Sequence, residues 1–227
     1  LIGGMGELHL DIMVDRLKRE FSVNAQIGSP QVAYREGILN SIIHTETLDR
    51  QAGGLRQNAQ LTFEISPNKK ESFSFESKLD KNILPDFLIT CISTRVKESF
   101  AAGPLAGYPV LGVCVKLLKA SYQTEKPDET SFQIATNIAI HSALQKLGTV
   151  LFEPVMSLEV NSPSDYMSNV ITDIGTRRAL VQDIVHKQTN QVLSAYVPLA
   201  EIFGYSTRLR SLSQGRASYV MKFHDYQ

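Results

Sequence analysis

The C-terminal third of the chain alternates between two hydrophobic periods, and this alternation limits the possible folds more than any other feature. Four segments carry apolar residues at every second position, which is the spacing of a half-buried strand. Two further segments carry them at helical spacing. The predicted strands are 156–160, 179–185, 192–197 and 217–223, and the predicted helices are 162–175 and 199–212. The resulting order βαββαβ is that of the split-βαβ, or ferredoxin-like, arrangement.

The first of these two helices has a predicted start at Ser162. The Ser162 hydroxyl can cap backbone N–H groups, Pro163 suits a first helical turn, and Asp165 would lie near the positive end of the helix dipole. Gly175 is expected to end the helix.

The first 36 residues predict one helix and one strand, which cannot bury a core by themselves. Apolar residues from Leu10 to Phe21 recur at helical spacing, and Val23, Ala25 and Ile27 alternate with polar residues as a strand. We therefore expect residues 1–36 to be the end of a domain whose front part is missing.

The middle region predicts an α+β domain. Residues 40–60 are polar and show no clear period, and Arg50–Asn58 has the glycines of a turn. The predicted elements are strand 61–65, its hairpin partner 73–75, helix 84–100, strand 113–117 and helix 132–143. A polar loop is expected at Tyr122–Pro127.

Composition argues against several classes of protein. Lys and Arg total 23, as do Asp and Glu, so the formal net charge of zero does not favour a strongly basic nucleic-acid-binding arm. The two cysteines form no disulfide framework and no Cys-x-x-Cys metal site. No apolar run reaches the roughly 18 residues of a membrane span, and the start does not resemble a signal peptide.

No motif predicts an active site in this chain. A phosphate-binding Gly-x-x-x-x-Gly-Lys-Ser/Thr loop and a Gly-x-Ser-x-Gly elbow are both absent, and the histidines show no metal-ligand spacing. Cys91 lies on the apolar face of a predicted helix, which favours a small core residue over a nucleophile. We expect no catalytic residue, no metal site and no cofactor within these residues.

The remaining candidates are polar loops and arginine clusters. Arg208, Arg210 and Arg216 surround a short segment that includes Gln214, and they suit either phosphate binding or a solvated surface. Arg177-Arg178 follows a helix end, so a structural and a binding role are equally expected. The loops at Arg50–Asn58 and Tyr122–Lys126 are either surface turns or tips that contact a partner.

Several strings of residues together resemble the elongation factor G family of translational GTPases. They are Gly3–Leu10, Gln31–Glu36, Gly103–Val110, Leu151–Met156, Val197–Arg210 and Ser213–Ser218. The resemblance implies the end of domain III in residues 1–36, domain IV in 37–152 and domain V in 153–227. The implied folds are α+β: a partial ferredoxin-like domain III, a ribosomal protein S5 domain 2-like domain IV and a ferredoxin-like domain V.

The sequence departs from the translocating members of that family at the two tip loops of domain IV. Their first loop reads Gly-Gly-Arg-Gly-Gln-Tyr-Gly, whereas here Gly53-Gly54 precedes Leu-Arg-Gln-Asn-Ala. Their second loop has a His-Asp pair after a tyrosine, whereas Tyr122 precedes Gln123-Thr124. Val32–Ser41 and Thr47–Arg50 resemble the mitochondrial, ribosome-releasing branch of the family.

By this resemblance, the parent protein would bind GTP and Mg²⁺ outside this chain and split post-termination ribosomes with ribosome recycling factor. The alternatives are a translocating elongation factor G and a stand-alone ribosome-associated module. We expect a monomer in the mitochondrial matrix, or else the bacterial cytoplasm, with neither membrane nor DNA as partner. The expected tip contacts with the ribosome are Arg50, Gln51, Gly53, Gly54, Arg56, Gln57, Gln123, Thr124 and Lys126. The expected contacts of domain V with large-subunit rRNA are Arg208, Arg210, Gln214 and Arg216.

Overall fold

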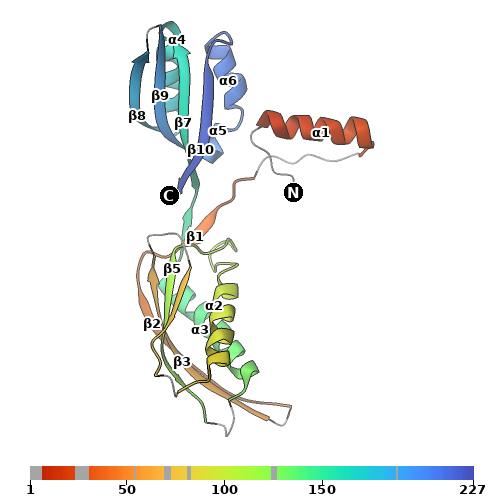
Figure 1. The fold of residues 1–227 in the computed structure, drawn as a ribbon, viewed down its shortest axis with the longest axis vertical. Coiled ribbons are helices and arrows are strands. Elements are labelled where there is room, and N and C mark those ends of the chain that lie inside the picture. Colours follow the sequence, from red (N-terminus) through yellow and green to blue (C-terminus); the bar gives the residue numbers. More distant parts are fainter. Residues whose placement is uncertain are drawn as a thin grey trace. The chain divides into compact units, whose positions relative to one another are not determined.

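The computed structural model describes residues 7–23, 31–53, 55–68, 73–80, 83–123, 127–187 and 189–227 (Figure 1). The chain divides into two compact units, one of residues 34–152 and one that combines residues 1–33 with 153–227. In the part of the chain that the structure describes, no helix is long and apolar enough to cross a membrane.

Helix α1 spans Glu7–Phe21 and confirms the helix predicted near the start. Its charged side chains pair one turn apart, with 2.9 Å between Arg19 Nε and Asp15 Oδ1 and 3.1 Å between Arg16 Nε and Glu20 Oε1. Such pairs stabilise an exposed helix only slightly. The strand predicted at 23–27 lies almost entirely outside the described residues.

The middle unit contains a four-stranded sheet in the order β2-β3-β5-β4. The strands are β2 (Ile42–Ala52), β3 (Leu55–Pro67), β4 (Ser74–Ser77) and β5 (Val113–Ser121). Helices α2 (Asp86–Ser99) and α3 (Glu129–Leu147) pack together and share one core with the sheet (Figure 1). The Asp128 carboxylate caps α3 by accepting from the backbone N–H groups of Thr130 and Ser131.

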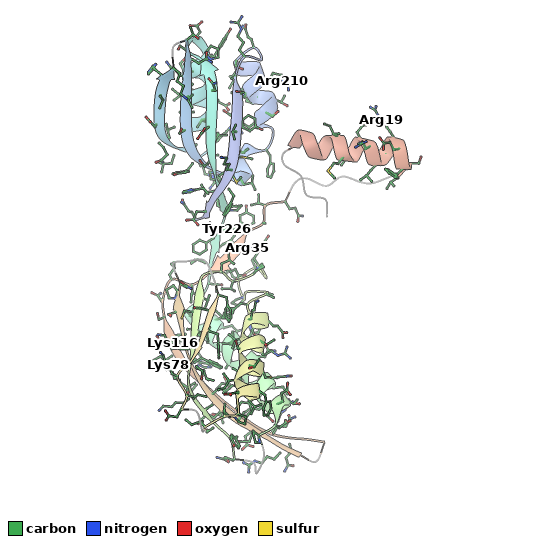
Figure 2. The ribbon with its side chains drawn as sticks, in the orientation of Figure 1. Arg19, Arg35, Lys78, Lys116, Arg210 and Tyr226 are labelled. Atoms are coloured by element: carbon green, nitrogen blue, oxygen red, sulfur yellow. The ribbon has the colours of Figure 1, made fainter. Side chains whose placement is uncertain are left out.

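Two predictions for this unit were wrong. The loop predicted at 50–58 is far shorter: β2 and β3 continue as an antiparallel hairpin as far as the Ala52–Leu55 pair, and the predicted glycine turn is confirmed at Gly53. The periodic signal fails there because both faces of this part of the hairpin carry polar side chains: Arg50 pairs with Gln57, and the adjacent Asp49 pairs with Arg56. Lys116 Nζ donates to Glu64 Oε1 at 3.0 Å on the same sheet, where Figure 2 shows Lys116 and Lys78.

The second wrong prediction concerns the partner of the strand at 73–75. This strand is β4, which pairs in parallel with β5 and not as a hairpin with β3. Strand β3 already pairs with β2 on one edge and β5 on the other, so no edge of β3 is free for β4. Alternation of apolar residues indicates a strand but does not identify its neighbour.

A separate two-stranded ladder joins the beginning and end of the middle unit. Strand β1 (Arg35–Gly37) pairs antiparallel with β6 (Val150–Phe152). A Cβ on Gly37 would overlap the Phe152 ring, so only glycine fits against that ring. Both ends of the unit are therefore held at one place.

The C-terminal sheet has the order β10-β7-β9-β8, with every neighbouring pair antiparallel. Its strands are β7 (Pro154–Pro163), β8 (Leu180–Lys187), β9 (Asn190–Pro198) and β10 (Ser218–Tyr226), and its helices are α4 (Ser164–Gly175), α5 (Leu199–Ile202) and α6 (Tyr205–Leu212). In the order of the strands along the chain, this sheet reads 4-1-3-2. The order βαββαβ and the ferredoxin-like fold are confirmed.

Two local predictions in this region need correction. Ser162 is the penultimate residue of β7, and Pro163 is the N-cap of α4 with no side-chain cap. The helix predicted across 199–212 is interrupted, because Gly204 adopts φ 74° between α5 and α6. Apolar spacing continues across such a break, since the left-handed residue changes the backbone direction without removing the apolar face.

Candidate functional site

The far end of the β2–β3 hairpin carries most of the predicted tip residues. Arg50 Nε donates to Gln57 Oε1 at 2.7 Å, and Arg56 binds Asp49 through two hydrogen bonds of 2.9 and 2.8 Å. The Arg56 guanidinium lowers the pKa of the Asp49 carboxyl below its ordinary value. Each arginine keeps further N–H groups for a partner, because a guanidinium has five donors.

The turn of this hairpin and the second tip loop are only partly described. Gly53 adopts φ 59°, a left-handed conformation that glycine adopts at little cost, and Gln51 is exposed at the end of β2. Gly54, Thr124 and Lys126 lie outside the described residues. Gln123 is within them.

The hairpin and the second loop meet at Asn58. Its side chain is only 6% exposed, and its Oδ1 accepts a hydrogen bond of 3.0 Å from the backbone N–H of Gln123. A second contact lies beside it, where the Ser121 hydroxyl donates to Gln60 Oε1 at 3.3 Å. The structure therefore brings the described residues of both predicted tips together.

In the C-terminal unit, two arginines converge on Asp173 of α4. Arg208 Nε and Arg177 Nε each lie 2.9 Å from one of its carboxylate oxygens, and the residue is 9% exposed. Burial alone would raise the pKa of Asp173, but the two guanidinium groups outweigh it and the net pKa is lowered. Arg208 thus ties α6 to α4.

Of the other three predicted residues of domain V, Gln214 and Arg216 contact Tyr166 near the start of α4. Arg210 is exposed and forms no ion pair with any residue of the described part of the chain (Figure 2). Gln214, with φ 51°, accepts a 3.0 Å hydrogen bond from the Tyr166 hydroxyl. The Arg216 guanidinium lies 6.0 Å from the centre of the Tyr166 ring. Arg210 and Arg216 are therefore the cations of this cluster that remain available to an anion.

Arg177 and Arg178 are both used within the fold. Besides Asp173, Arg177 binds the backbone carbonyl of Glu201 and lies 5.1 Å from the centre of the Tyr205 ring. Arg178 binds the carboxylates of Glu153 and Glu201, at 2.8 and 2.9 Å. These contacts fit the structural interpretation of the Arg177-Arg178 pair.

Sequence reasoning missed Glu36, the most completely buried carboxylate among the described residues. It is 0% exposed, and its oxygens accept from the backbone N–H groups of Leu105, Ala106 and Tyr108 at 3.1, 2.8 and 3.2 Å. The Thr149 hydroxyl donates at 2.7 Å. Burial by itself raises the pKa of Glu36, and these four neutral donors together lower it below the ordinary value.

The loop around Glu36 leaves no room for another side chain. A Cβ on Gly103 would overlap the Glu36 carboxylate, so a glycine is required there. An isolated acidic residue at a predicted domain boundary has no periodic pattern, and its only sequence signal was its place in the family-like string Gln31–Glu36.

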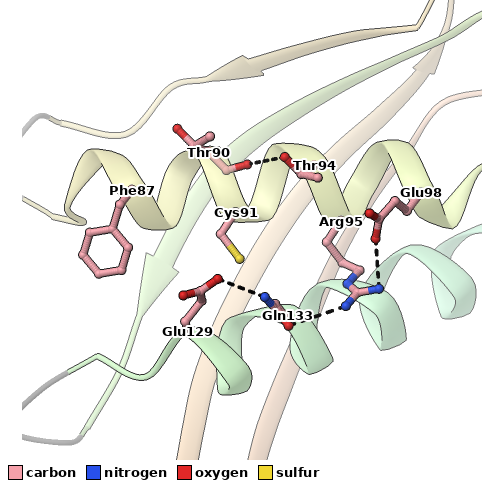
Figure 3. Close-up of a pocket in the computed structure, with 8 residues that line it drawn as sticks. All are labelled: Phe87, Thr90, Cys91, Thr94, Arg95, Glu98, Glu129 and Gln133. Atoms are coloured by element: carbon pink, nitrogen blue, oxygen red, sulfur yellow. Dashed lines mark hydrogen bonds and ion pairs between the residues drawn. The ribbon is translucent and has the colours of Figure 1, made fainter.

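A cleft of about 350 Å³ lies between α2 and α3 (Figure 3). It is lined by Phe87, Thr90, Cys91, Thr94, Arg95, Glu98, Glu129 and Gln133. Burial raises the pKa of the Cys91 thiol, which disfavours the nucleophilic thiolate. Arg95 forms an ion pair with Glu98 at 3.0 Å, so these two charged side chains of the cleft largely neutralise each other.

Models of three successive parts of one family match the chain. Residues 1–29 match Elongation Factor G, domain III; residues 30–147 match Elongation factor G, domain IV; and residues 150–227 match Elongation factor G C-terminus. A crystal structure of a protein from Thermus thermophilus has a TM-score of 0.86 at 29% identity, covering 98% of this chain and 33% of that one.

Curated bacterial relatives agree with these matches. Elongation factor G of Thermotoga maritima is 46% identical over 230 residues, and that of Fervidobacterium nodosum is 43% identical over 228 residues. Each alignment covers 100% of this chain but 33% of the relative. Because the domain IV model alone matches more than half of the residues, the chain belongs to the elongation factor G family and carries its C-terminal domains III to V.

Proposed function

We propose that the chain is the ribosome-binding C-terminal portion of a translational GTPase that splits post-termination ribosomes into subunits together with ribosome recycling factor. GTP and Mg²⁺ would be bound outside residues 1–227. The parent protein would act in the mitochondrial matrix, with the bacterial cytoplasm as the alternative. The chain itself would contribute contacts with the ribosome and no catalytic group.

The observation that carries this proposal is the chemistry of the second tip loop. Gln123 follows Tyr122 where the translocating members have a His-Asp pair. A glutamine cannot ionise, whereas a histidine can change its charge near neutral pH. A loop without that pair supplies different donors and a different charge to an RNA duplex, which fits a factor that no longer moves tRNA and mRNA.

The tip hairpin would present guanidinium groups in fixed positions. Arg50 and Arg56 are each held by a partner on the opposite strand, so little side-chain entropy is lost when RNA binds. In domain V, Arg210 and Arg216 would contact rRNA phosphates, because an arginine fork matches phosphate oxygens. Arg208 would act indirectly by holding α6 against α4 through Asp173.

Translocation is the second candidate function. The bacterial relatives at 46% and 43% identity carry the name elongation factor G and align with the whole chain. An overall identity of this size is compatible with a translocating factor whose tip loops have diverged.

The test uses the full-length protein in two parallel assays, with bacterial and mitochondrial ribosomes. We expect subunit splitting that requires recycling factor and GTP, without translocation. A normal translocation rate would instead support the second candidate. Arg210→Ala should weaken ribosome binding severalfold, while the matched charge removal Lys222→Ala, on the exposed part of β10, should not.

The tip hypothesis has its own test. If the tip loops divide the two functions, then Gln123→His combined with a restored Gly-Gly-Arg-Gly-Gln-Tyr-Gly loop should give measurable translocation. If that variant shows no translocation, the chemistry of the tip loops is not what separates the two functions.

A further inference from the structure

The two tips of domain IV are joined by one buried side chain, that of Asn58. It lies near the start of β3, directly opposite Asp49 of β2 in the antiparallel register. Its Oδ1 accepts from the backbone N–H of Gln123 at 3.0 Å, and the side chain is 6% exposed. A backbone N–H of the second loop therefore depends on a side chain of the hairpin.

The Asp49 carboxylate lies across the hairpin from Asn58, which helps to lower the pKa of that carboxyl. The same carboxylate is held by two hydrogen bonds from Arg56. These neighbouring groups form a path from Arg56, by way of Asp49 and Asn58, to the backbone of Gln123. This path connects the described residues of the first tip with those of the second.

From this path we propose that Asn58 is a positioning residue, which fixes the second tip loop against the hairpin so that both tips meet the ribosome as one surface. The part of this inference that concerns the ribosome rests on the proposed function. Asn58 itself is too buried to be a principal contact, so its effect would pass through Gln123.

The chemistry of an amide explains why asparagine suits this place. Its carbonyl oxygen accepts from the Gln123 N–H, and its amide NH₂ group can donate toward the carboxylate of Asp49 on the opposite strand. Leucine of similar size offers neither group and would leave the Gln123 N–H without this acceptor. Aspartate retains the acceptor for Gln123 but cannot donate to Asp49, and it places two like charges opposite each other.

The experiment compares Asn58→Leu, Asn58→Ala and Asn58→Asp in the full-length protein, with Thr45→Val as the matched control. Thr45 also makes a cross-strand hydrogen bond in this hairpin, 2.9 Å to Thr62, but closer to its base. The first readout is residue-resolved hydrogen exchange at the Gln123 amide. We expect exchange about fivefold faster in the leucine and alanine variants, which is the effect of losing one ordinary hydrogen bond. The valine variant should keep the native rate within about twofold, and the aspartate variant should lie between valine and alanine, because it keeps the acceptor but places a like charge opposite Asp49.

The second readout is the rate of ribosome splitting with recycling factor and GTP. We expect Asn58→Leu and Asn58→Ala to slow it severalfold, Asn58→Asp to retain most of it, and Thr45→Val to leave it unchanged. Native exchange at Gln123 in the alanine variant would overturn the coupling. Faster exchange at the Gln123 amide together with a native rate of ribosome splitting would show that Asn58 has no role on the ribosome. If the unmodified protein does not split ribosomes, the proposed function fails, and the exchange measurement still decides whether Asn58 couples the tips.

Discussion

Among the residues that the structure describes, each compact unit contains one nearly inaccessible carboxylate, and the two are stabilised by opposite means. Glu36 accepts from three backbone N–H groups and one hydroxyl, all neutral. Asp173 is held by the guanidinium groups of Arg177 and Arg208. Both carboxyls have a lowered pKa, so in each case hydrogen bonding outweighs the cost of burying a charge.

The difference lies in what the donors can do if the carboxylate is lost. The N–H groups at Glu36 belong to the tight loop at 105–108 and cannot turn to water without unfolding that loop. Arg208 is 56% exposed in its side chain and can rotate into solvent. A carboxylate bound by backbone therefore fixes the shape of a loop, whereas one bound by arginines fixes the relation between two helices more loosely.

The largest expected effect is that of Glu36→Ala. Four donors would lose their acceptor, and we expect unfolding of the middle unit to become easier by about 4 kcal/mol. Glu36→Gln should cost about half as much, because the Thr149 hydroxyl can reverse and accept from the new amide. Hydrogen exchange of residues 103–108 at increasing urea concentration measures both.

Glu64→Gln is the matched control for this prediction. Glu64 is a partly buried carboxylate of the same unit, but its partner is the mobile ammonium of Lys116. A cost for Glu64→Gln equal to that for Glu36→Ala would contradict the distinction between fixed and mobile donors.

The corresponding change in the C-terminal unit is Asp173→Asn. The new amide oxygen can accept from one guanidinium, while the other arginine must turn to water, and we expect a cost of about 2 kcal/mol. Hydrogen exchange of α4 and α6 at increasing urea concentration measures this cost. If this variant is destabilised as much as Glu36→Ala, the freedom of Arg208 to rotate is not what separates the two sites.

As the pH falls, the stabilisation from Glu36 should be lost before that from Asp173. A carboxyl whose pKa is lower in the folded state stabilises the protein above its ordinary pKa, and this contribution is lost as the pH falls toward the lowered value. The ordinary values are 4.5 for Glu36 and 3.8 for Asp173, so the middle unit should begin to lose stability at the higher pH. Exchange measured between pH 6 and 3 tests this order. Glu36→Gln should flatten the pH dependence of hydrogen exchange at residues 103–108. An unchanged pH dependence would show that Glu36 is not the group whose protonation destabilises this loop.

The sequence predicted the C-terminal unit better than the middle unit for a physical reason. In β7 and β9 one face packs on helices, so Leu158, Val160, Leu193 and Ala195 are buried in strict alternation. In β2 the inner positions include His44, whose ring is held by Glu46 at 3.2 Å, and the outer face is polar. Polar residues that are satisfied by partners across the fold remove the periodic signal on which strand prediction depends.

The candidate site shows the same limit at the level of single residues. The loops and arginine clusters could be found from composition and family resemblance, but the sequence treats Arg208 and Arg210 alike. Only the fold shows that Arg208 lies against Asp173, 35 positions earlier in the chain, while Arg210 does not. The same holds for Glu36 and Thr149, which are 113 positions apart. Long-range pairing of this kind has no local signature.

The smallest expected effect concerns an ion pair that resembles the Asp173 cluster in chemistry but not in burial. Arg178 binds Glu153 and Glu201 with a side chain that is 55% exposed, and exposed pairs contribute little. Arg178→Ala should therefore cost only about 0.5 kcal/mol at low ionic strength, and 0.5 M salt should remove most of that difference by screening. The cost of Asp173→Asn should persist in the same salt, because its oxygens lie largely out of contact with the solvent. Equal salt dependence in the two variants would show that the Asp173 cluster is as open to solvent as Arg178, and the contrast between a buried carboxylate held by arginines and an ordinary surface pair would then disappear.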